Sequence, residues 1–190
     1  MHQRPRGAVT ATNEPSELGG AGAASLATGV TRSPEATRAV GRALAVLSQP
    51  GDVVVLAGDL GAGKTTLAQG FATGLGVTDP VTSPTFALMR QYRCALAPVQ
   101  ALLHLDLYRL DRLAEVADLG VAQLVEEDAV ALVEWGDVAT SVLGDDLLTV
   151  WLRPGAEPGE RIVELWTRGE RWDGRAGELR AALRAGASRP

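Results

Sequence analysis

The chain has 190 residues, a net charge of −5 and 46% apolar residues, enough for the core of one domain. It lacks a run of Lys and Arg that could track a phosphate backbone, which disfavours direct, strong binding to nucleic acid. The single cysteine, Cys94, excludes an internal disulfide and a multi-cysteine metal site, and no apolar run approaches membrane-spanning length. We therefore expect a soluble, cytoplasmic protein that does not engage membranes.

The composition changes at both ends of the chain and divides it into three parts. Residues 1–23 are rich in Gly, Ala, Thr and Pro without an apolar period, which predicts a disordered N-terminal tail. The folded domain is expected over residues 24–168. Residues 169–190 are rich in Arg, Gly and Ala, and we expect a flexible C-terminal tail, with a short helix over 175–184 as the alternative to disorder.

The first elements of the domain alternate between strand and helix. Residues 24–30 predict a short edge strand, and Ser33 and Pro34 then have the residue types of a helix N-cap and first helical position. The helix is amphipathic, with apolar residues at i, i+4 and i+7: Val40, Leu44 and Leu47. The continuous apolar run at 53–57 predicts a buried strand.

The second half of the domain is predicted to be mostly strands. Two strands, over 86–94 and 102–107, are close enough in sequence to form an antiparallel hairpin. Two short helices are expected over 111–118 and 121–127. Three further strands are expected over 129–133, which has the pattern of a strand buried on both faces, and over 147–152 and 161–166. Together the elements predict an α/β fold, a P-loop NTPase-like three-layer sandwich with a mixed, partly parallel central sheet.

The stretch from Gly58 to Thr65 links the buried strand at 53–57 to a helix and has the complete spacing G-x-x-x-x-G-K-[ST]. Its glycines let the backbone turn tightly, so that successive N–H groups and the helix N-terminus can face polyphosphate. Lys64 can reach the β- and γ-phosphates, and the Thr65 hydroxyl can ligate Mg²⁺. The alternative is a glycine-rich turn that binds nothing. Lys64 is the only lysine among 18 basic residues, and a compact ammonium suits this loop better than a guanidinium, which favours the phosphate site.

A nucleotide site also needs an acidic residue at the end of a buried strand to hold Mg²⁺ directly or through water. Asp106 and Glu134 both follow apolar runs, and the alternative for each is an ordinary carboxylate at a strand end. Hydroxyls over 82–85 could sense the γ-phosphate, or the segment could be a turn before a strand. A guanine-reading N-K-x-D motif is impossible because Asn13 is the only asparagine and Lys64 the only lysine, which favours ATP over GTP.

Four motifs follow one another along the chain: GDLGAGKTT at 58–66, SPTF at 83–86, HLDLYRL at 104–110 and VEW at 133–135. Together they resemble the TsaE (YjeE) family of bacterial P-loop ATPases, over roughly residues 26–166. The resemblance implies a role in making threonylcarbamoyladenosine in tRNA, together with the TsaD–TsaB pair that performs the transfer. It further implies a Mg²⁺-dependent ATPase that is weak alone and resets that pair, and that contacts tRNA only indirectly through its partners.

The resemblance also implies site residues. Asp106, Lys64 and Glu134 take catalytic roles, with Asp106 at the Walker-B-like position that orients the attacking water, and Thr65 and Glu134 ligate Mg²⁺. The nucleotide-binding positions are Ser33, Pro34 and Thr37 on the adenine side, Asp59, Leu60, Gly61, Ala62, Gly63, Lys64, Thr65 and Thr66 around the phosphates, and Ser83 and Thr85 in the switch-like segment. Two other functions remain open: a small-molecule kinase using the same loop, and a nucleotide-gated interaction module that does not hydrolyse ATP.

Overall fold

The computed structural model describes residues 25–84, 87–108, 118, 120, 121, 125 and 128–187. The tail predicted over 1–23 lies outside the described residues, as do most residues of the helices predicted over 111–118 and 121–127. Within the part of the chain that the structure describes, no helix is both long and apolar enough to cross a membrane.

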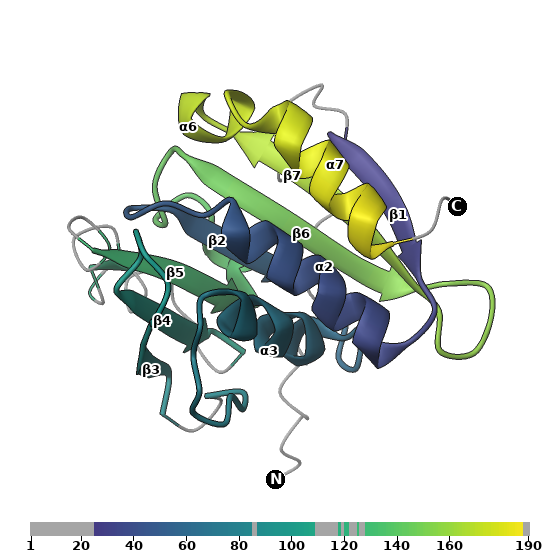
Figure 1. Cartoon of the computed structure of the whole chain (residues 1–190), viewed down its shortest axis with the longest axis horizontal. Helices are drawn as coiled ribbons and strands as arrows, with labels where there is room; N and C mark the ends of the chain where they lie inside the picture. Colours follow the sequence, from purple (N-terminus) through teal and green to yellow (C-terminus); the bar gives the residue numbers. More distant parts are fainter. Residues whose placement is uncertain are drawn as a thin grey trace, which may run out of the picture.

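A seven-stranded sheet with the order β1-β7-β6-β2-β5-β4-β3 forms the centre of the fold (Figure 1). Its strands are β1 (Ala27–Thr31), β2 (Val53–Ala57), β3 (Met89–Arg93), β4 (Ala101–Asp106), β5 (Ala129–Glu134), β6 (Leu147–Pro154) and β7 (Arg161–Arg168). The four central strands β6, β2, β5 and β4 are parallel, and the outer pairs β1–β7, β7–β6 and β4–β3 are antiparallel. The predicted mixed, partly parallel sheet is confirmed, including β1 at an edge and the β3–β4 hairpin.

The central strands are apolar throughout because both faces of the sheet are covered. In β2, Val54 and Leu56 point into one core, and Val53 and Val55 point into a second core on the opposite face. All five residues of β2 and all six of β5 are buried. Because β2 leads directly into the phosphate loop and β5 ends at Glu134, both parts are held by rigid strands.

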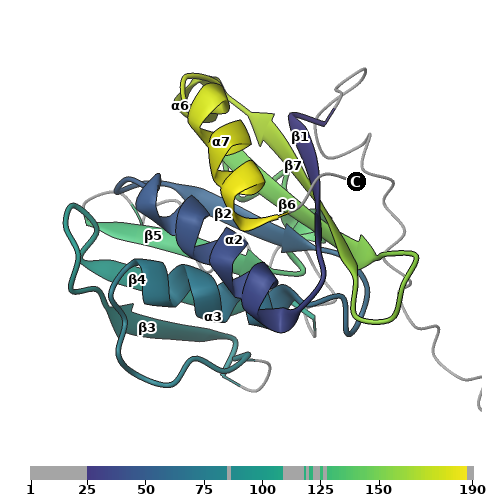
Figure 2. The ribbon, with the colours of Figure 1, turned by 45° about the vertical axis from the view of Figure 1, so that its right-hand side comes forward.

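Helices cover one face of the sheet. On this face α2 (Pro34–Val46) lies between α3 (Lys64–Gly74) and α7 (Ala176–Gly186), and the short α6 (Glu170–Asp173) precedes α7 (Figures 1 and 2). Ser33 caps α2, since its side chain accepts a hydrogen bond from the N–H of Ala36 at 3.1 Å. The opposite face is covered by the 3-10 helix η1 (Gly136–Ala139) and by Leu107, Val121, Val125 and Leu143. These layers confirm the predicted three-layer α/β sandwich.

The strand predicted over 86–94 is shorter than expected. It begins at Met89, because Leu88 has a φ of 64° and its N–H donates to the carbonyl of Pro84 at 2.8 Å. This left-handed residue closes a turn that alternation of apolar residues could not reveal. Phe86, at the predicted start of the strand, lies outside the described residues.

Residues 169–187 pack on the domain: the short helix considered over 175–184 is present as α7, whereas the flexible tail that the composition suggested is not. Trp172, Leu179 and Leu183 are buried, and α7 packs on α2 and β1. The buried side chain of Asp52 accepts two hydrogen bonds from Arg175, at 2.6 and 2.8 Å, which ties the start of α7 to the segment before β2. The spacing of Leu179 and Leu183 is that of an amphipathic helix, but the surrounding arginines and alanines gave little sign that this helix packs on the domain.

Candidate functional site

The phosphate loop leaves the carboxyl end of β2 and enters α3, and its glycines take backbone conformations that other residues rarely adopt. Gly58, Gly61 and Gly63 have φ values of 126°, 78° and 107°. Gly63 is the N-cap of α3, and no side chain of the described residues caps this helix end. The first-turn N–H groups of α3 are therefore available to an anion, as the loop pattern predicted.

Gly58 and Gly61 differ in how much space surrounds them, and this difference predicts the outcome of adding a methyl group. A Cβ at Gly58 would lie 2.0 Å from the carbonyl oxygen of Leu152, whereas a Cβ at Gly61 meets no described atom within 4 Å. Gly61→Ala should lower the free energy of unfolding by about 1–2 kcal/mol, the backbone cost of a left-handed residue. Gly58→Ala should lower the free energy of unfolding by about 1–3 kcal/mol more, because the loop and β6 must also move apart.

Urea unfolding of the two glycine variants beside the wild-type chain measures both costs. Gly61→Ala is the matched control, because it adds the same methyl group to the same loop without the close contact. Equal destabilisation by the two substitutions would contradict the packing of Gly58 against β6.

Lys64 is buried at the start of α3, and its ammonium is held by the loop itself. Nζ donates to the carbonyl oxygens of Gly58 at 2.6 Å and Asp59 at 2.9 Å, and it lies 3.5 Å from the centroid of the Trp135 ring. Burial lowers the pKa of Lys64 below its ordinary value, and nearby carboxylates, Glu134 foremost, oppose that shift. The charge thus sits within the loop without a direct ion pair among the described residues.

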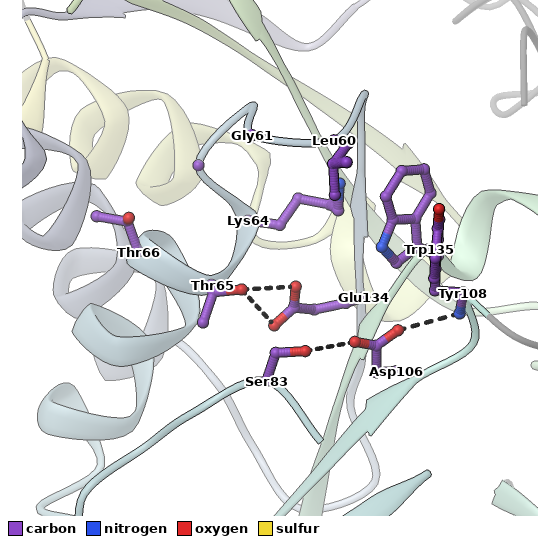
Figure 3. Close-up of a pocket in the computed structure, with 11 residues that line it drawn as sticks. Leu60, Gly61, Lys64, Thr65, Thr66, Ser83, Asp106, Tyr108, Glu134 and Trp135 are labelled. Carbon is purple, nitrogen blue, oxygen red and sulfur yellow. Dashed lines mark hydrogen bonds between the residues drawn. The ribbon is translucent and has the colours of Figure 1, made fainter. Parts of the chain in front are cut away.

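Two carboxylates end adjacent parallel strands and face the start of α3 (Figure 3). Asp106 pairs with Glu134 in the register of β4 and β5, and both are buried. The Thr65 hydroxyl lies 3.2 and 3.0 Å from the two carboxylate oxygens of Glu134. Asp106 accepts a hydrogen bond from the Ser83 hydroxyl and another, at 3.0 Å, from the N–H of Tyr108. The loop, the two strand ends and the segment at Ser83 therefore converge on one place.

A cavity of about 410 Å³ lies at this convergence and is lined by Leu60, Gly61, Gly63, Lys64, Thr65, Thr66, Ser83, Asp106, Tyr108, Glu134 and Trp135. Nine of these residues were among the predicted site residues. Asp59 and Ala62 belong to the loop but do not line the cavity. Thr85 lies outside the described residues.

The residues predicted for the adenine side do not line the cavity either. Ser33 caps α2, Pro34 begins it, and the buried Thr37 hydroxyl lies 2.8 Å from that of Thr31. In the structure these side chains serve the local fold of β1 and α2.

Tyr108 and Trp135 line the cavity and were absent from the predicted site. Their ring centroids are 5.0 Å apart with an interplanar angle of 47°. Trp135 has a φ of 59°, an unusual conformation for a bulky residue and one that often marks a functional site. The sequence signal was their position, because each follows a predicted carboxylate by one or two residues.

Comparison with known proteins agrees with the motifs. The family model described as "Threonylcarbamoyl adenosine biosynthesis protein TsaE" matches residues 31–162. The tRNA threonylcarbamoyladenosine biosynthesis protein TsaE of Bacillus subtilis is 38% identical over 143 residues, covering 75% of this chain and 87% of the relative. The protein of the same name from Streptomyces coelicolor is 41% identical over 139 residues, covering 71% of this chain and 93% of the relative.

The fold is also similar to that of a solved structure. The crystal structure of Bacillus subtilis YdiB superposes with a TM-score of 0.67 and 33% sequence identity, covering 80% of this chain and 93% of that one. From the family match, the relatives and this structural similarity, we conclude that the chain belongs to the TsaE family of threonylcarbamoyladenosine biosynthesis proteins.

Proposed function

We propose that this chain binds ATP with Mg²⁺ in the cavity beside the phosphate loop and hydrolyses it in support of threonylcarbamoyladenosine synthesis in tRNA. The observation that carries the proposal is the pairing of Thr65, the last residue of the loop motif, with the buried carboxylate of Glu134. A hydroxyl and a carboxylate at the N-terminus of a helix supply oxygen ligands and, nearby, anion-binding N–H groups.

The loop suits the triphosphate of ATP. Its backbone N–H groups and the N-terminus of α3 favour negative charge, and Lys64 supplies a full positive charge within the same cavity. Among the described residues, Nζ is held by two loop carbonyls and by the face of Trp135, so a phosphate oxygen can take over as a partner with a small movement of the side chain. The N–H dipoles of the loop and the ammonium of Lys64 then face the phosphate oxygens together.

The oxygen ligands suit Mg²⁺ bound together with phosphate. Among the described residues no group of three His, Cys, Asp or Glu side chains could hold a metal by itself. Mg²⁺ usually binds through one or two carboxylates plus substrate phosphates and water, which fits Glu134 and Thr65. The bound ion would neutralise charge that develops on the phosphates during hydrolysis. Glu134 and Thr65 are already oriented toward one another (Figure 3).

We propose that Asp106 orients the attacking water. Hydrogen bonds from the Ser83 hydroxyl and the Tyr108 N–H fix its carboxylate at the cavity wall. Ser83 belongs to the predicted switch-like segment, so this contact joins that segment to the proposed water site. A carboxylate held in this way can hold a water molecule in line with the γ-phosphate and accept its proton.

The names of the relatives place them in threonylcarbamoyladenosine biosynthesis, and we propose the same pathway and the TsaD–TsaB pair as partners for this chain. ATP hydrolysis should be slow with the chain alone and faster with the pair. Measuring phosphate release with and without the pair tests this, with a screen of small acceptors in parallel. Turnover only with a small acceptor would indicate a kinase, and tight ATP binding with no turnover under any condition would indicate a pure binding module.

Lys64→Ala should weaken ATP binding by roughly tenfold or more, since hydrogen bonds to charged groups contribute about 1.5–3 kcal/mol. The fold should survive because the ammonium contacts the loop and one aromatic ring rather than the apolar core. Calorimetric titration with ATP and Mg²⁺ measures the loss. Arg93→Ala removes an exposed positive charge from β3 and is the matched control. Equal affinities for the Lys64 variant and the control would reject the phosphate site.

A further inference from the structure

His104 lies in the middle of β4 and faces the same side of the sheet as the proposed site. Because side chains alternate along a strand, Leu102, His104 and Asp106 share one face. Leu102 belongs to the core under the helices, whereas Leu103 and Leu105 belong to the core on the opposite face. The imidazole is 0% exposed, so a polar ring is buried two residues before Asp106.

The polar contact of this ring is to Glu134. His104 Nε2 lies 2.9 Å from Oε1 of Glu134, the oxygen that also lies 3.2 Å from the Thr65 hydroxyl. In the register of β4 and β5, His104 lies opposite Leu132 and Glu134 lies opposite Asp106. The Glu134 side chain therefore reaches back along the strands to the imidazole, and its carboxylate is held from two sides.

The second ring nitrogen shows which atom carries the proton. Among the described residues, Nδ1 has no hydrogen-bond partner. A carboxylate accepts and cannot donate, so Nε2 carries the proton in the bond to Glu134. Burying a polar ring costs free energy unless its groups are hydrogen-bonded, and an apolar side chain would fill this buried position opposite Leu132 without that cost. The contact with Glu134 is what an apolar residue could not supply.

We propose that His104 is a positioning residue that fixes the Glu134 carboxylate for Mg²⁺. The inference rests on the proposed function, since it concerns the residue to which we assign metal binding. Without the Nε2 donor, the Thr65 hydroxyl is the hydrogen-bond donor that Glu134 keeps among the described residues, and its carboxylate can rotate away from the orientation that the metal needs. Hydrogen bonds to a metal-binding group typically change metal affinity by about 10–100-fold.

The test compares three substitutions that differ in the donor they leave. His104→Gln can place an amide nitrogen near the position of Nε2, His104→Asn is too short to do so, and His104→Leu carries no donor. The measured quantity is the ratio of the Kd for a non-hydrolysable ATP analogue in EDTA to its Kd in Mg²⁺. Leu102→Ala is the matched control, because it removes buried volume from the same face of β4 at a residue that lies opposite Val130 and has no polar group to offer Glu134.

We expect this ratio to fall about tenfold or more in His104→Asn and His104→Leu, and to stay close to the wild-type value in His104→Gln. Leu102→Ala should lower the melting temperature and leave the ratio unchanged. A wild-type ratio in the donor-free variants would overturn the proposal, and so would an equal loss in His104→Gln. Failure of both donor-free variants to fold would also overturn it, because the imidazole would then be needed for the stability of the core. If the wild-type chain itself binds no nucleotide, it is the proposed function that fails instead.

Discussion

Asp106→Asn is expected to bind ATP and Mg²⁺ nearly normally and to lose turnover by roughly 10²-fold or more, the usual scale for a general acid–base group. The asparagine oxygen can still accept from the Tyr108 N–H, and the Ser83 hydroxyl can turn to accept from the amide. The geometry therefore persists while the negative charge is lost. The variant should accumulate in the ATP-bound state with the partner proteins.

Glu134→Gln should fail in a different way. It keeps the shape of the side chain but removes the charge next to the Thr65 hydroxyl, so the dependence of nucleotide binding on Mg²⁺ should weaken and turnover should be lost with it. Mg²⁺-dependent affinity and single-turnover hydrolysis, measured side by side for the two variants, separate the roles. If Asp106→Asn loses Mg²⁺-dependent binding while Glu134→Gln retains it, the two assignments are reversed.

Arg175→Ala is expected to lower the free energy of unfolding by about 3–5 kcal/mol, because it removes the two short hydrogen bonds to the buried carboxylate of Asp52. That carboxylate then keeps a longer contact with Arg171, at 3.4 Å, and the N–H of Gln49. Asp52 is 1% exposed and accepts from Arg175 at 2.6 and 2.8 Å. The guanidinium also donates to the carbonyl of Leu47 at 2.8 Å and lies 3.9 Å from the Trp172 ring centroid. One substitution therefore removes the link between α7, the end of α2 and the start of β2.

Denaturant unfolding measures the cost of losing Arg175, and Arg184→Ala is the matched control because this exposed arginine lies on the same helix. Arg175→Lys should recover only part of the stability, since an ammonium cannot make the bidentate contact with Asp52 or stack on the Trp172 indole in the same way. If Arg175→Ala and Arg184→Ala are equally stable, residues 169–187 are not anchored through this ion pair.

Features whose residues are contiguous in the chain could be predicted from the sequence. The phosphate loop was predictable because all of its parts lie within eight residues, between a fully apolar strand and a helix. The strands at 53–57 and 129–133 were predictable because burial on both faces leaves an unbroken apolar run. Asp106 and Glu134 could be proposed as acids at strand ends, but the sequence did not say that they are neighbours.

Contacts between distant residues could not be predicted in this way, because strand order is set by packing rather than by local pattern. Thr65 and Glu134 are 69 positions apart and come together because β5 lies beside β2. His104 reaches Glu134 only because β4 is the next strand along. Asp52 and Arg175 are 123 positions apart, and their contact turns an arginine-rich segment that resembled a tail into a packed helix. A buried ion pair of this kind leaves no periodic signal, since it depends on one residue at each end.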